Sequence, residues 1–468
     1  MLVFALVTLY ILIALVLVIG LLINGVKPSK TLAWLLAIFT IPVGGILLYI
    51  MLGRNRRKKR LSRLRKDALQ IPSFPNSILQ NTSSPKYRKL MTLIESVSDF
   101  APTDKNAVTL LEDGKLTFHN IFKAMEMAEK YIYLQYYIFE EGELTTKLLW
   151  LLEKKVKDGV TVKLIYDGVG SYTLSRSYIK KLKAIGVEVY PFLPFRFGRF
   201  LSSLNYRNHR KITIIDGKIA FTGGMNISDR YFKGDPNLGR WHDMHLAIKG
   251  PAVAYMEHIF VSDWFMVTEK KIDFEICSAE AADGKENTLV QMVPSGPDDV
   301  FPNIEQSYLV IINEARKYLY IVNPYIIPSG EILKALQIAA LSGVDVRLLI
   351  SAQSDSKLVD WTVRSYFDSF LKAGIRIFLF PHGFLHSKIL ISDDDVASVG
   401  TANIDVRSFE HNYEVNALLY DSRIAKTLKE NFIKDCGESR ELIAEEYYER
   451  PLFHKIKEGL ARIFAPLL

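Results

Sequence analysis

Two short motifs of identical composition could together transfer a phosphodiester group. The first consists of His209, Lys211 and Asp216, and the second of His386, Lys388 and Asp393. One imidazole can attack phosphorus to form a phosphohistidine, while the other protonates the leaving alkoxide and then deprotonates the incoming acceptor. The lysines can bind the non-bridging oxygens, whose negative charge spreads in the transition state. Such a site requires no metal ion, and no cofactor is predicted.

The two motifs are copies of one repeated unit. Each residue of the second motif lies 177 positions after its counterpart in the first. Gly400 and Asn403 follow Gly223 and Asn226 at the same spacing. Segments upstream of the motifs are also similar, and the similar pairs are 131–139 with 318–327, 158–167 with 342–351, and 184–192 with 373–381. A repeat in constant register indicates a duplicated body, and it favours one shared site over two separate sites.

Four further residues are candidates for supporting this chemistry. Asn226 and Asn403 can add neutral hydrogen-bond donors to the phosphate oxygens. Asp243 and Glu414 follow the two motifs, and a carboxylate there could hold an imidazole by its far ring nitrogen, which fixes its tautomer and orientation. A surface or purely structural role for these carboxylates remains open. The two motif aspartates are expected to shape the turns after their strands more than to touch phosphate.

Alternating strands and amphipathic helices must position these residues. Apolar runs such as VTVKLIYD follow helical stretches such as TKLLWLLEKKVKDG, which predicts two α/β halves over 67–275 and 276–450. The runs Ile212–Ile215 and Ile389–Ile391 are strand-like, so each His-x-Lys pair is predicted to lie on a strand with both side chains on one face. Asp216–Gly217 is predicted to form the hairpin turn after the first of these strands.

The amino-terminal region, 1–53, predicts a transmembrane hairpin. Residues 2–23 and 31–52 carry no charge, and each stretch, as a helix rising 1.5 Å per residue, could cross a bilayer core of roughly 30 Å. A cleaved signal peptide is the rival interpretation of the first stretch. It is disfavoured because no basic region leads the stretch and a second apolar stretch follows at once.

Positive charge gathers in residues 54–66, just after the predicted hairpin. The chain has a net charge of +8, and this segment contributes nine basic residues and no acidic one, which leaves −1 for the rest. The positive-inside rule places the segment in the cytoplasm, where it can also attract anionic headgroups. The near-neutral body argues against a nucleic-acid partner. Cys277 and Cys436 cannot form a disulfide framework and give no metal signature.

At these residues the sequence resembles the phospholipase D superfamily, whose signature is a paired HxKxxxxD motif followed by Gly and Asn. Within it, the chain is similar to the bacterial cardiolipin synthases over both apolar stretches, the basic segment and blocks such as YRNHRKITIIDG, GRWHDMHL and GTANIDVRSFEHNYEVN. The resemblance implies a phosphatidyltransferase of the inner or cytoplasmic cell membrane, with its catalytic body on the cytoplasmic side. It also implies that phosphatidylglycerol is donor and acceptor, that cardiolipin and glycerol are the products, and that the six motif residues form one catalytic site. The D-G-x2-A-R pattern of the metal-dependent, eukaryotic-type enzymes is absent from the sequence.

Several alternatives stay open at this point. A lipase of the same superfamily differs only in accepting water, and a related phosphatidyltransferase could use another acceptor. A nuclease would be expected to carry a basic face on the folded body. A non-enzymatic lipid-binding scaffold is disfavoured because both motifs are complete.

The carboxyl-terminal residues, 451–468, predict an amphipathic helix. Its apolar stripe consists of Leu452, Phe453, Ile456, Leu460, Ile463, Phe464 and Leu467. Such a helix could lie on a membrane surface or pack on the body. The sequence alone does not decide between these two placements.

Overall fold

The computed structural model describes residues 1–23, 28–41, 43–49, 85–193, 206–272 and 287–468. The chain divides into two compact units, residues 1–63 with 195–205 and residues 64–194 with 206–468. The basic segment 54–66 and Cys277 lie outside the described residues. The predictions made for them therefore stay predictions.

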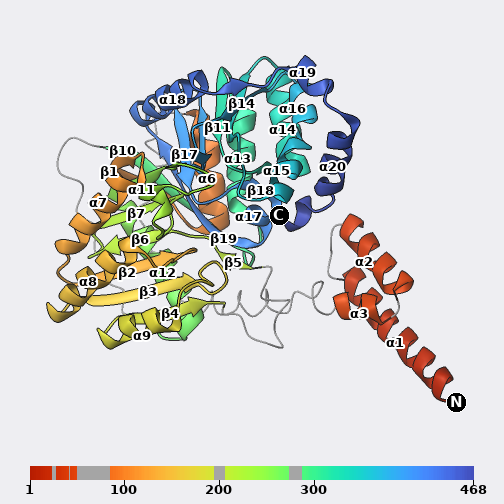
Figure 1. Ribbon diagram of the computed structural model, residues 1–468, viewed down its shortest axis with the longest axis horizontal. Helices are drawn as coiled ribbons and strands as arrows, with labels where there is room; N and C mark the ends of the chain where they lie inside the picture. Colours follow the sequence, from red (N-terminus) through yellow and green to blue (C-terminus); the bar gives the residue numbers. More distant parts are fainter. Residues whose placement is uncertain (24–27, 42, 50–84, 194–205, 273–286) are drawn as a thin grey trace. The chain divides into compact units, whose positions relative to one another are not determined.

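Three helices form the described part of the first unit (Figure 1). They are α1 (Leu2–Ile23), α2 (Pro28–Thr40) and α3 (Gly44–Leu48). α1 is 22 residues long and has no charged residue, and its Leu17 and Leu21 join Ile38 and Ile46 in a small apolar core. Among the described residues, no helix combines the length and the apolar character needed to cross a membrane.

The second predicted span, 31–52, is not one continuous helix. α2 ends at Thr40 and α3 begins at Gly44, with Val43 between them at a φ of 65°. The sequence has Pro42 at this break, and a proline lacks a backbone N–H and disfavours helical geometry in the residue before it. The described helices therefore do not confirm the transmembrane hairpin, and the two spans stay a prediction.

The first described element of the second unit is α6 (Pro85–Ser98), and two similar halves follow it. In the first half the elements are β1 (Thr103–Leu111), α7 (Gly114–Glu126), β2 (Tyr131–Tyr136), α8 (Glu143–Lys157), β3 (Thr161–Asp167), α9 (Arg176–Ala184), β4 (Glu188–Phe192), β5 (Arg207–Asn208), β6 (Ile212–Ile215), β7 (Ile219–Gly223), α11 (Arg230–Lys233), β8 (Trp241–His242), β9 (His245–Lys249) and α12 (Ala252–Thr268).

The second half repeats this order with small additions. Its elements are β10 (Thr288–Ser295), α13 (Asn303–Glu314), β11 (Tyr318–Val322), β12 (Ile326–Ile327), α14 (Gly330–Leu341), β13 (Asp345–Ser351), α15 (Lys357–Arg364), α16 (Phe367–Leu371), β14 (Arg376–Phe380), β15 (Phe384–Leu385), β16 (Ile389–Ser392), β17 (Val396–Gly400), β18 (Ile404–Asp405), α17 (Val406–Glu410), β19 (Asn412–Tyr420) and α18 (Ser422–Gly437). The chain ends with β20 (Arg440–Glu441), α19 (Ala444–Tyr448), α20 (Leu452–Arg462) and a 3₁₀ turn at Ala465–Leu467.

One 16-stranded sheet runs through both halves, and its order displays the duplication. The order is β20-β14-β13-β11-β16-β17-β19-β10-β1-β9-β7-β6-β2-β3-β4, with β5 paired to β19. β1 and β10 pair antiparallel in the middle, and equivalent strands follow outward from them in each half. The similar upstream segments found in the sequence are thus equivalent strands. The predicted duplicated α/β body is confirmed.

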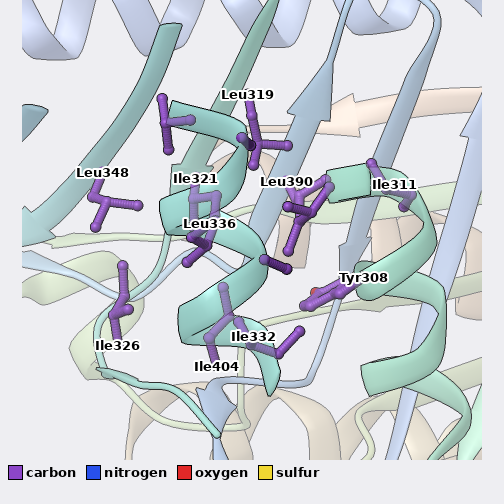
Figure 2. Packing of buried hydrophobic residues seen from close by; sticks show 14 of the residues in the cluster. Tyr308, Ile311, Leu319, Ile321, Ile326, Ile332, Leu336, Leu348, Leu390 and Ile404 are labelled. Atoms are coloured by element: carbon purple, nitrogen blue, oxygen red, sulfur yellow. The ribbon is translucent and has the colours of Figure 1, made fainter. Parts of the chain in front are cut away.

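Helices cover both faces of this sheet, because alternate residues of a strand point to opposite sides. In β11, Leu319 joins the large apolar core against α13 and α14 (Figure 2). Its neighbour Tyr320 points the other way and stacks on Phe432 of α18, with ring centroids 4.6 Å apart. In the first half, Tyr133 of β2 stacks on Phe260 of α12 at 4.7 Å. Burial on both faces explains why these strands read as continuous apolar runs.

Candidate active site

Each motif histidine is placed by a two-residue strand that pairs with the opposite half. β5 of the first half lies parallel to β19 of the second, and β15 of the second lies parallel to β8 of the first. The His209 backbone N–H donates to the Tyr413 carbonyl at 2.9 Å, and the His386 N–H donates to the His242 carbonyl at 2.7 Å. The halves thus exchange short segments, and both motifs lie where the halves meet.

The His-x-Lys pairs do not lie on strands, contrary to the sequence prediction. β6 begins at Ile212 and β16 at Ile389, in each case just after the motif lysine. The chain there changes from a strand paired with the opposite half to a strand paired within its own half, and this change of partner interrupts the ladder. The predicted strands do follow, and the turn at Asp216–Gly217 has φ values of 54° and 64°.

His209 is held by a carboxylate from the second half. Its Nδ1 lies 2.9 Å from a Glu414 carboxylate oxygen and 3.1 Å from the Thr401 carbonyl oxygen. Because both neighbours present acceptor oxygens, Nδ1 carries the hydrogen and Nε2 keeps its lone pair. Glu414 is itself fixed by the Thr401 hydroxyl at 2.5 Å and by the Asn412 amide at 3.3 Å.

His386 is held by a carboxylate from the first half. Its Nδ1 lies 2.7 Å from Asp243 Oδ2, while Asp243 Oδ1 accepts the backbone N–H of Met244 at 2.8 Å. A Cβ atom at Gly224 would lie 2.0 Å from Asp243 Oδ1, so only glycine leaves room for this carboxylate. The Trp241 ring lies 5.2 Å from the His386 ring and forms an apolar wall beside it. Each carboxylate that the sequence suggested as a support therefore contacts the histidine of the opposite motif.

Both motif lysines are buried beside these histidines. Lys211 is 0% exposed and Lys388 is 1% exposed. Each Nζ donates to the carbonyl oxygen of the histidine two residues earlier, at 2.6 Å in the first motif. The Tyr137 ring lies 5.5 Å from Lys211 Nζ and 4.8 Å from the His209 ring. An ammonium group has three donors, so each lysine retains donors that can bind phosphate oxygens.

Burial dominates the ionisation of the histidines and lysines. It lowers the pKa of His209 to about 4, against the opposing effect of Glu414. Burial also lowers the pKa of His386 well below its usual value, and the charges of Lys388 and Lys211 act in the same direction. Burial lowers the pKa of Lys211 to about 7 and that of Lys388 to about 8. Each lysine acts on both histidines, so the two motifs form one electrostatic site.

The two supporting carboxylates differ in ionisation. Burial raises the pKa of Asp243 to about 6, despite the charge of Lys388. Burial also opposes the ionisation of Glu414, but His209 and Lys211 outweigh it and the pKa of Glu414 is lowered. At neutral pH, Glu414 is therefore the more firmly ionised of the two carboxylates.

The motif aspartates lie at the far ends of β6 and β16 and bind backbone N–H groups. Asp216 accepts hydrogen bonds at 2.8 Å from Glu129, Lys130 and Tyr131. Asp393 accepts equivalent bonds at 2.8, 2.8 and 3.0 Å from Arg316, Lys317 and Tyr318. Each carboxylate ties the turn after its strand to the start of β2 or β11. These contacts agree with the expectation that the aspartates shape turns, and they give both residues a structural role.

The repeated asparagines are bound differently. Asn226 Oδ1 accepts the Ile138 N–H at 3.1 Å, and its Nδ2 donates to the Tyr231 hydroxyl at 3.2 Å. Asn403 is 8% exposed, and within the described part of the chain its Oδ1 has no hydrogen-bond partner. Since an amide oxygen only accepts hydrogen bonds, Asn403 could bind a phosphate oxygen only through its Nδ2 donor.

Two residues at the site were not singled out from the sequence. Thr401 binds Glu414, and Tyr137 faces the first motif. The position equivalent to Thr401 in the first copy is Gly224, and the position equivalent to Tyr137 in the second copy is Pro324. Neither residue is repeated, so the duplication that revealed the motifs could not reveal them.

This arrangement can carry out nucleophilic and acid–base chemistry at phosphorus. Both imidazoles use Nδ1 to bind a carboxylate, which leaves Nε2 for the reaction, and two buried lysines supply positive charge for the diester. Throughout the part of the chain that the structure describes, no group of three or more His, Cys, Asp or Glu side chains could hold a metal ion.

Two known families match the chain. The family described as "Cardiolipin synthase, PLD-like domain" matches residues 121–264 and 308–436, one segment in each half. The family described as "Phospholipase_D-nuclease N-terminal" matches residues 9–54. The first match includes both His-x-Lys motifs.

Individual relatives match over nearly the whole chain. Cardiolipin synthase 2 of Bacillus anthracis is 40% identical over 452 residues, which cover 94% of this chain and 87% of that protein. The cardiolipin synthase of Geobacillus sp. (strain WCH70) is 40% identical over 450 residues, with coverage of 94% and 89%. Among solved structures, phosphatidylserine synthase of Haemophilus influenzae Rd KW20 has a TM-score of 0.61 at 14% identity, covering 81% of this chain and 97% of that one. This last likeness concerns the fold alone.

Proposed function

Because this chain belongs to the cardiolipin synthases with a phospholipase D-like domain and is thus a phosphatidyltransferase, we propose that it transfers a phosphatidyl group from one phosphatidylglycerol to another. The products are cardiolipin and glycerol. The observation that carries the proposal is the crossed pairing of His209 with Glu414 and of His386 with Asp243. A single site built from both halves then holds two imidazoles that can take opposite roles.

In the first step, His209 Nε2 attacks the phosphorus of the donor lipid. The nitrogen lone pair forms the P–N bond, and the bond from phosphorus to the headgroup glycerol oxygen breaks with its electron pair on that oxygen. His386 gives the oxygen a proton, so that neutral glycerol leaves. The His209 ring becomes positively charged, and the ionised Glu414 beside its Nδ1 stabilises that charge. This last point is our reason for choosing His209 as the nucleophile.

In the second step, the headgroup hydroxyl of a second phosphatidylglycerol attacks the phosphohistidine. The P–O bond forms while the P–N bond breaks, and its electron pair returns to His209. The neutral His386 takes the hydroxyl proton and is ready to act as an acid again. Cardiolipin leaves, and both imidazoles have returned to their initial states.

The acid role of His386 requires that substrate binding raise its pKa. Besides burial, the charges of Lys388 and Lys211 lower that pKa. A phosphodiester bound between the two lysines brings a negative charge that offsets them. Lys211, Lys388 and the Asn403 amide then bind the non-bridging oxygens. The diester therefore creates the protonation state that its own cleavage needs.

We also propose that the first unit attaches the enzyme to the inner or cytoplasmic membrane of the bacterial cell, with the second unit on the cytoplasmic side. Exposed apolar side chains of α1 support this attachment, and they include Phe4, Leu9, Ile11, Leu12, Leu15, Val16, Leu22 and Ile23. The family match over 9–54 also supports it. Two full spans over 2–23 and 31–52 are the finer form of the proposal. Resistance of the membrane-bound protein to alkaline extraction, and its release by detergent, would test the attachment; release by alkali alone would contradict it.

The proposed reaction is tested by incubating the purified enzyme with phosphatidylglycerol labelled in its headgroup glycerol and in its acyl chains. We expect labelled free glycerol and doubly labelled cardiolipin in equal amounts. Phosphatidic acid as the main product would show hydrolysis instead of transfer. A different phospholipid, formed only when a second alcohol is added, would show another acceptor. Quenching during turnover with a denaturant at neutral pH, which preserves the acid-labile P–N bond, should leave the phosphatidyl label on His209, and its recovery on His386 would reverse the two roles.

A further inference from the structure

Helix α20 turns a continuous apolar face outward. Its large apolar side chains are 47–70% exposed and comprise Leu452, Phe453, Ile456 and Leu460, together with Ile463 and Phe464 just after the helix. They recur at the spacing of one helical face. Figure 1 shows α20 at the outside of the second half, beside α15. The structure thus leaves uncovered the stripe that the sequence predicted, apart from Leu467, whose side chain lies outside the described residues.

The opposite face of α20 binds the helix to the rest of the second unit. Glu458 is buried and binds Arg450 at 2.8 Å and the Tyr447 hydroxyl at 3.3 Å. The Thr362 hydroxyl of α15 donates to the Ala461 carbonyl at 3.1 Å. These bonds fix the rotation of α20 about its axis. The apolar residues are therefore held outward, and a small rotation of the helix cannot hide them.

Cationic groups border this face. Within α20, all of whose residues the structure describes, Lys455 and Arg462 are exposed, Lys457 is half-buried, and the one acidic residue, Glu458, is buried. The preceding helix, α19, carries acidic residues in its first turn, so the cationic character of α20 does not extend to α19. An amphipathic helix with exposed apolar residues and flanking cations is suited to an interface that is both apolar and anionic.

We propose that the outward face of α20 docks on an anionic lipid surface, with its apolar side chains among the acyl chains and its cations at the headgroups. The choice of lipid over a second protein rests on this charge pattern and on the proposed function, in which both substrates are anionic phospholipids of one leaflet. Docking at α20 gives the second unit its own contact with the bilayer. That contact is separate from the attachment of the first unit, and it holds the site near its substrates.

Insertion of α20 can be measured directly in the full-length protein. A Leu460→Cys variant is made with Cys277→Ser and carries an environment-sensitive fluorophore; Cys436 is buried, and burial raises its pKa to about 12, so its thiol does not compete for the label. The protein is reconstituted in vesicles of phosphatidylglycerol and phosphatidylcholine, some with spin labels on the acyl chains. We expect blue-shifted emission that the spin labels quench. A label at Ile338→Cys on α14, where the native side chain is 62% exposed, should remain unquenched.

Activity gives a second, independent measurement. In the variant Leu460→Glu with Ile463→Glu, turnover on the vesicles should fall by about tenfold or more, because two large apolar side chains no longer leave water, while turnover on detergent-dispersed phosphatidylglycerol should match the wild type. The matched control is Ile338→Glu with Leu341→Glu, which introduces the same charges at positions that are 62% and 73% exposed. It should retain wild-type turnover in both systems.

Two outcomes of the fluorescence measurement would overturn the docking proposal. Unquenched and unshifted emission at residue 460 would place α20 in water. A blue shift without quenching would mean that protein covers the face, and its loss on dilution would identify a second copy. Equal losses of turnover in vesicles and detergent would show that the double glutamate variant misfolds, and the quenching measurement, which does not use that variant, would then decide the proposal. If the wild type forms no cardiolipin at all, the proposed function fails, yet the quenching measurement still decides whether α20 meets lipid.

Discussion

Replacing Glu414 with glutamine separates the charge of this residue from its shape. Glutamine keeps an oxygen that can accept the hydrogen bonds which His209 Nδ1 and the Thr401 hydroxyl now donate at 2.9 and 2.5 Å. It removes the negative charge that should stabilise the His209 ring when that ring becomes positive. The variant therefore tests whether Glu414 acts electrostatically in the reaction, and not only as a support for the imidazole.

The expected loss is large because the pair is buried. At an effective dielectric constant of about 20, a carboxylate in contact with an imidazolium gains about 4–6 kcal/mol. A charged hydrogen bond that becomes neutral loses about 1 kcal/mol more. The lower figure alone corresponds to about a 10³-fold fall in kcat, since about 1.4 kcal/mol is a factor of ten. We expect Glu414→Gln to lose at least this factor.

The pH dependence of kcat also distinguishes the two roles, because a purely structural role of Glu414 would leave this dependence unchanged. Activity requires protonated lysines, so it should fall as the pH rises through the pKa of Lys211, about 7, and of Lys388, about 8. Glu414 raises both pKa values. Its neutralisation should therefore move the alkaline limb to lower pH. The control variant Thr401→Val keeps the charge and should leave the limb in place while losing about tenfold in kcat.

Measurements of phosphatidylglycerol turnover in detergent, from pH 5 to 9, would decide the matter. Far-ultraviolet circular dichroism and thermal melting of each variant would confirm that it is folded. A folded Glu414→Gln enzyme with kcat within tenfold of the wild type would refute the electrostatic role. A fall in kcat without a shift of the alkaline limb of the pH profile would refute the coupling of Glu414 to the two lysines.

Three further predictions concern other parts of the site. His209→Ala and His386→Ala should each abolish cardiolipin formation, and quenching in a neutral denaturant should trap label only in an enzyme that retains the nucleophile; residual turnover above background in either variant would contradict the shared site. Asp243→Asn should move the alkaline limb of the kcat profile to lower pH, because Asp243 raises the pKa of Lys388; an unchanged limb would argue against this coupling. Asp216→Ala should lower the free energy of unfolding by about 3 kcal/mol, because a buried carboxylate that binds three N–H groups is lost, and denaturant unfolding should reveal it; unchanged stability would show that water replaces the carboxylate.

The catalytic positions could be found from the sequence because duplication repeats them in constant register. The crossed pairing could not be found in this way. It depends on β5 and β15, which are only two residues long and carry no strand pattern of their own. The sequence indicated that Asp243 and Glu414 could support the histidines. It did not indicate which histidine each carboxylate contacts, because that depends on how the two-residue strand before each histidine pairs with the opposite half. Long-range pairing of such short segments has no local signal.

The alternation of strands and helices likewise predicted two α/β halves but not their continuous sheet. That sheet depends on the antiparallel pairing of β1 with β10, in which Thr103 lies opposite Val290. Apolar strands of this kind can pair with many partners, so their order is fixed by packing of the whole unit. The His-x-Lys pairs were predicted to lie on strands because the alternation of side chains does not show where the chain changes from one pairing strand to another.

The crossed pairing also explains why neither half can act alone. The first half alone would contain His209 without Glu414, and the second alone would contain His386 without Asp243. Each imidazole would then lack the group that fixes its tautomer. The copies have meanwhile become unequal, because Thr401 stands where the first copy has Gly224, and only Glu414 gains a hydroxyl partner. This inequality favours His209 for the nucleophilic role, because its partner Glu414 is the more firmly ionised carboxylate and can stabilise a positively charged phosphohistidine.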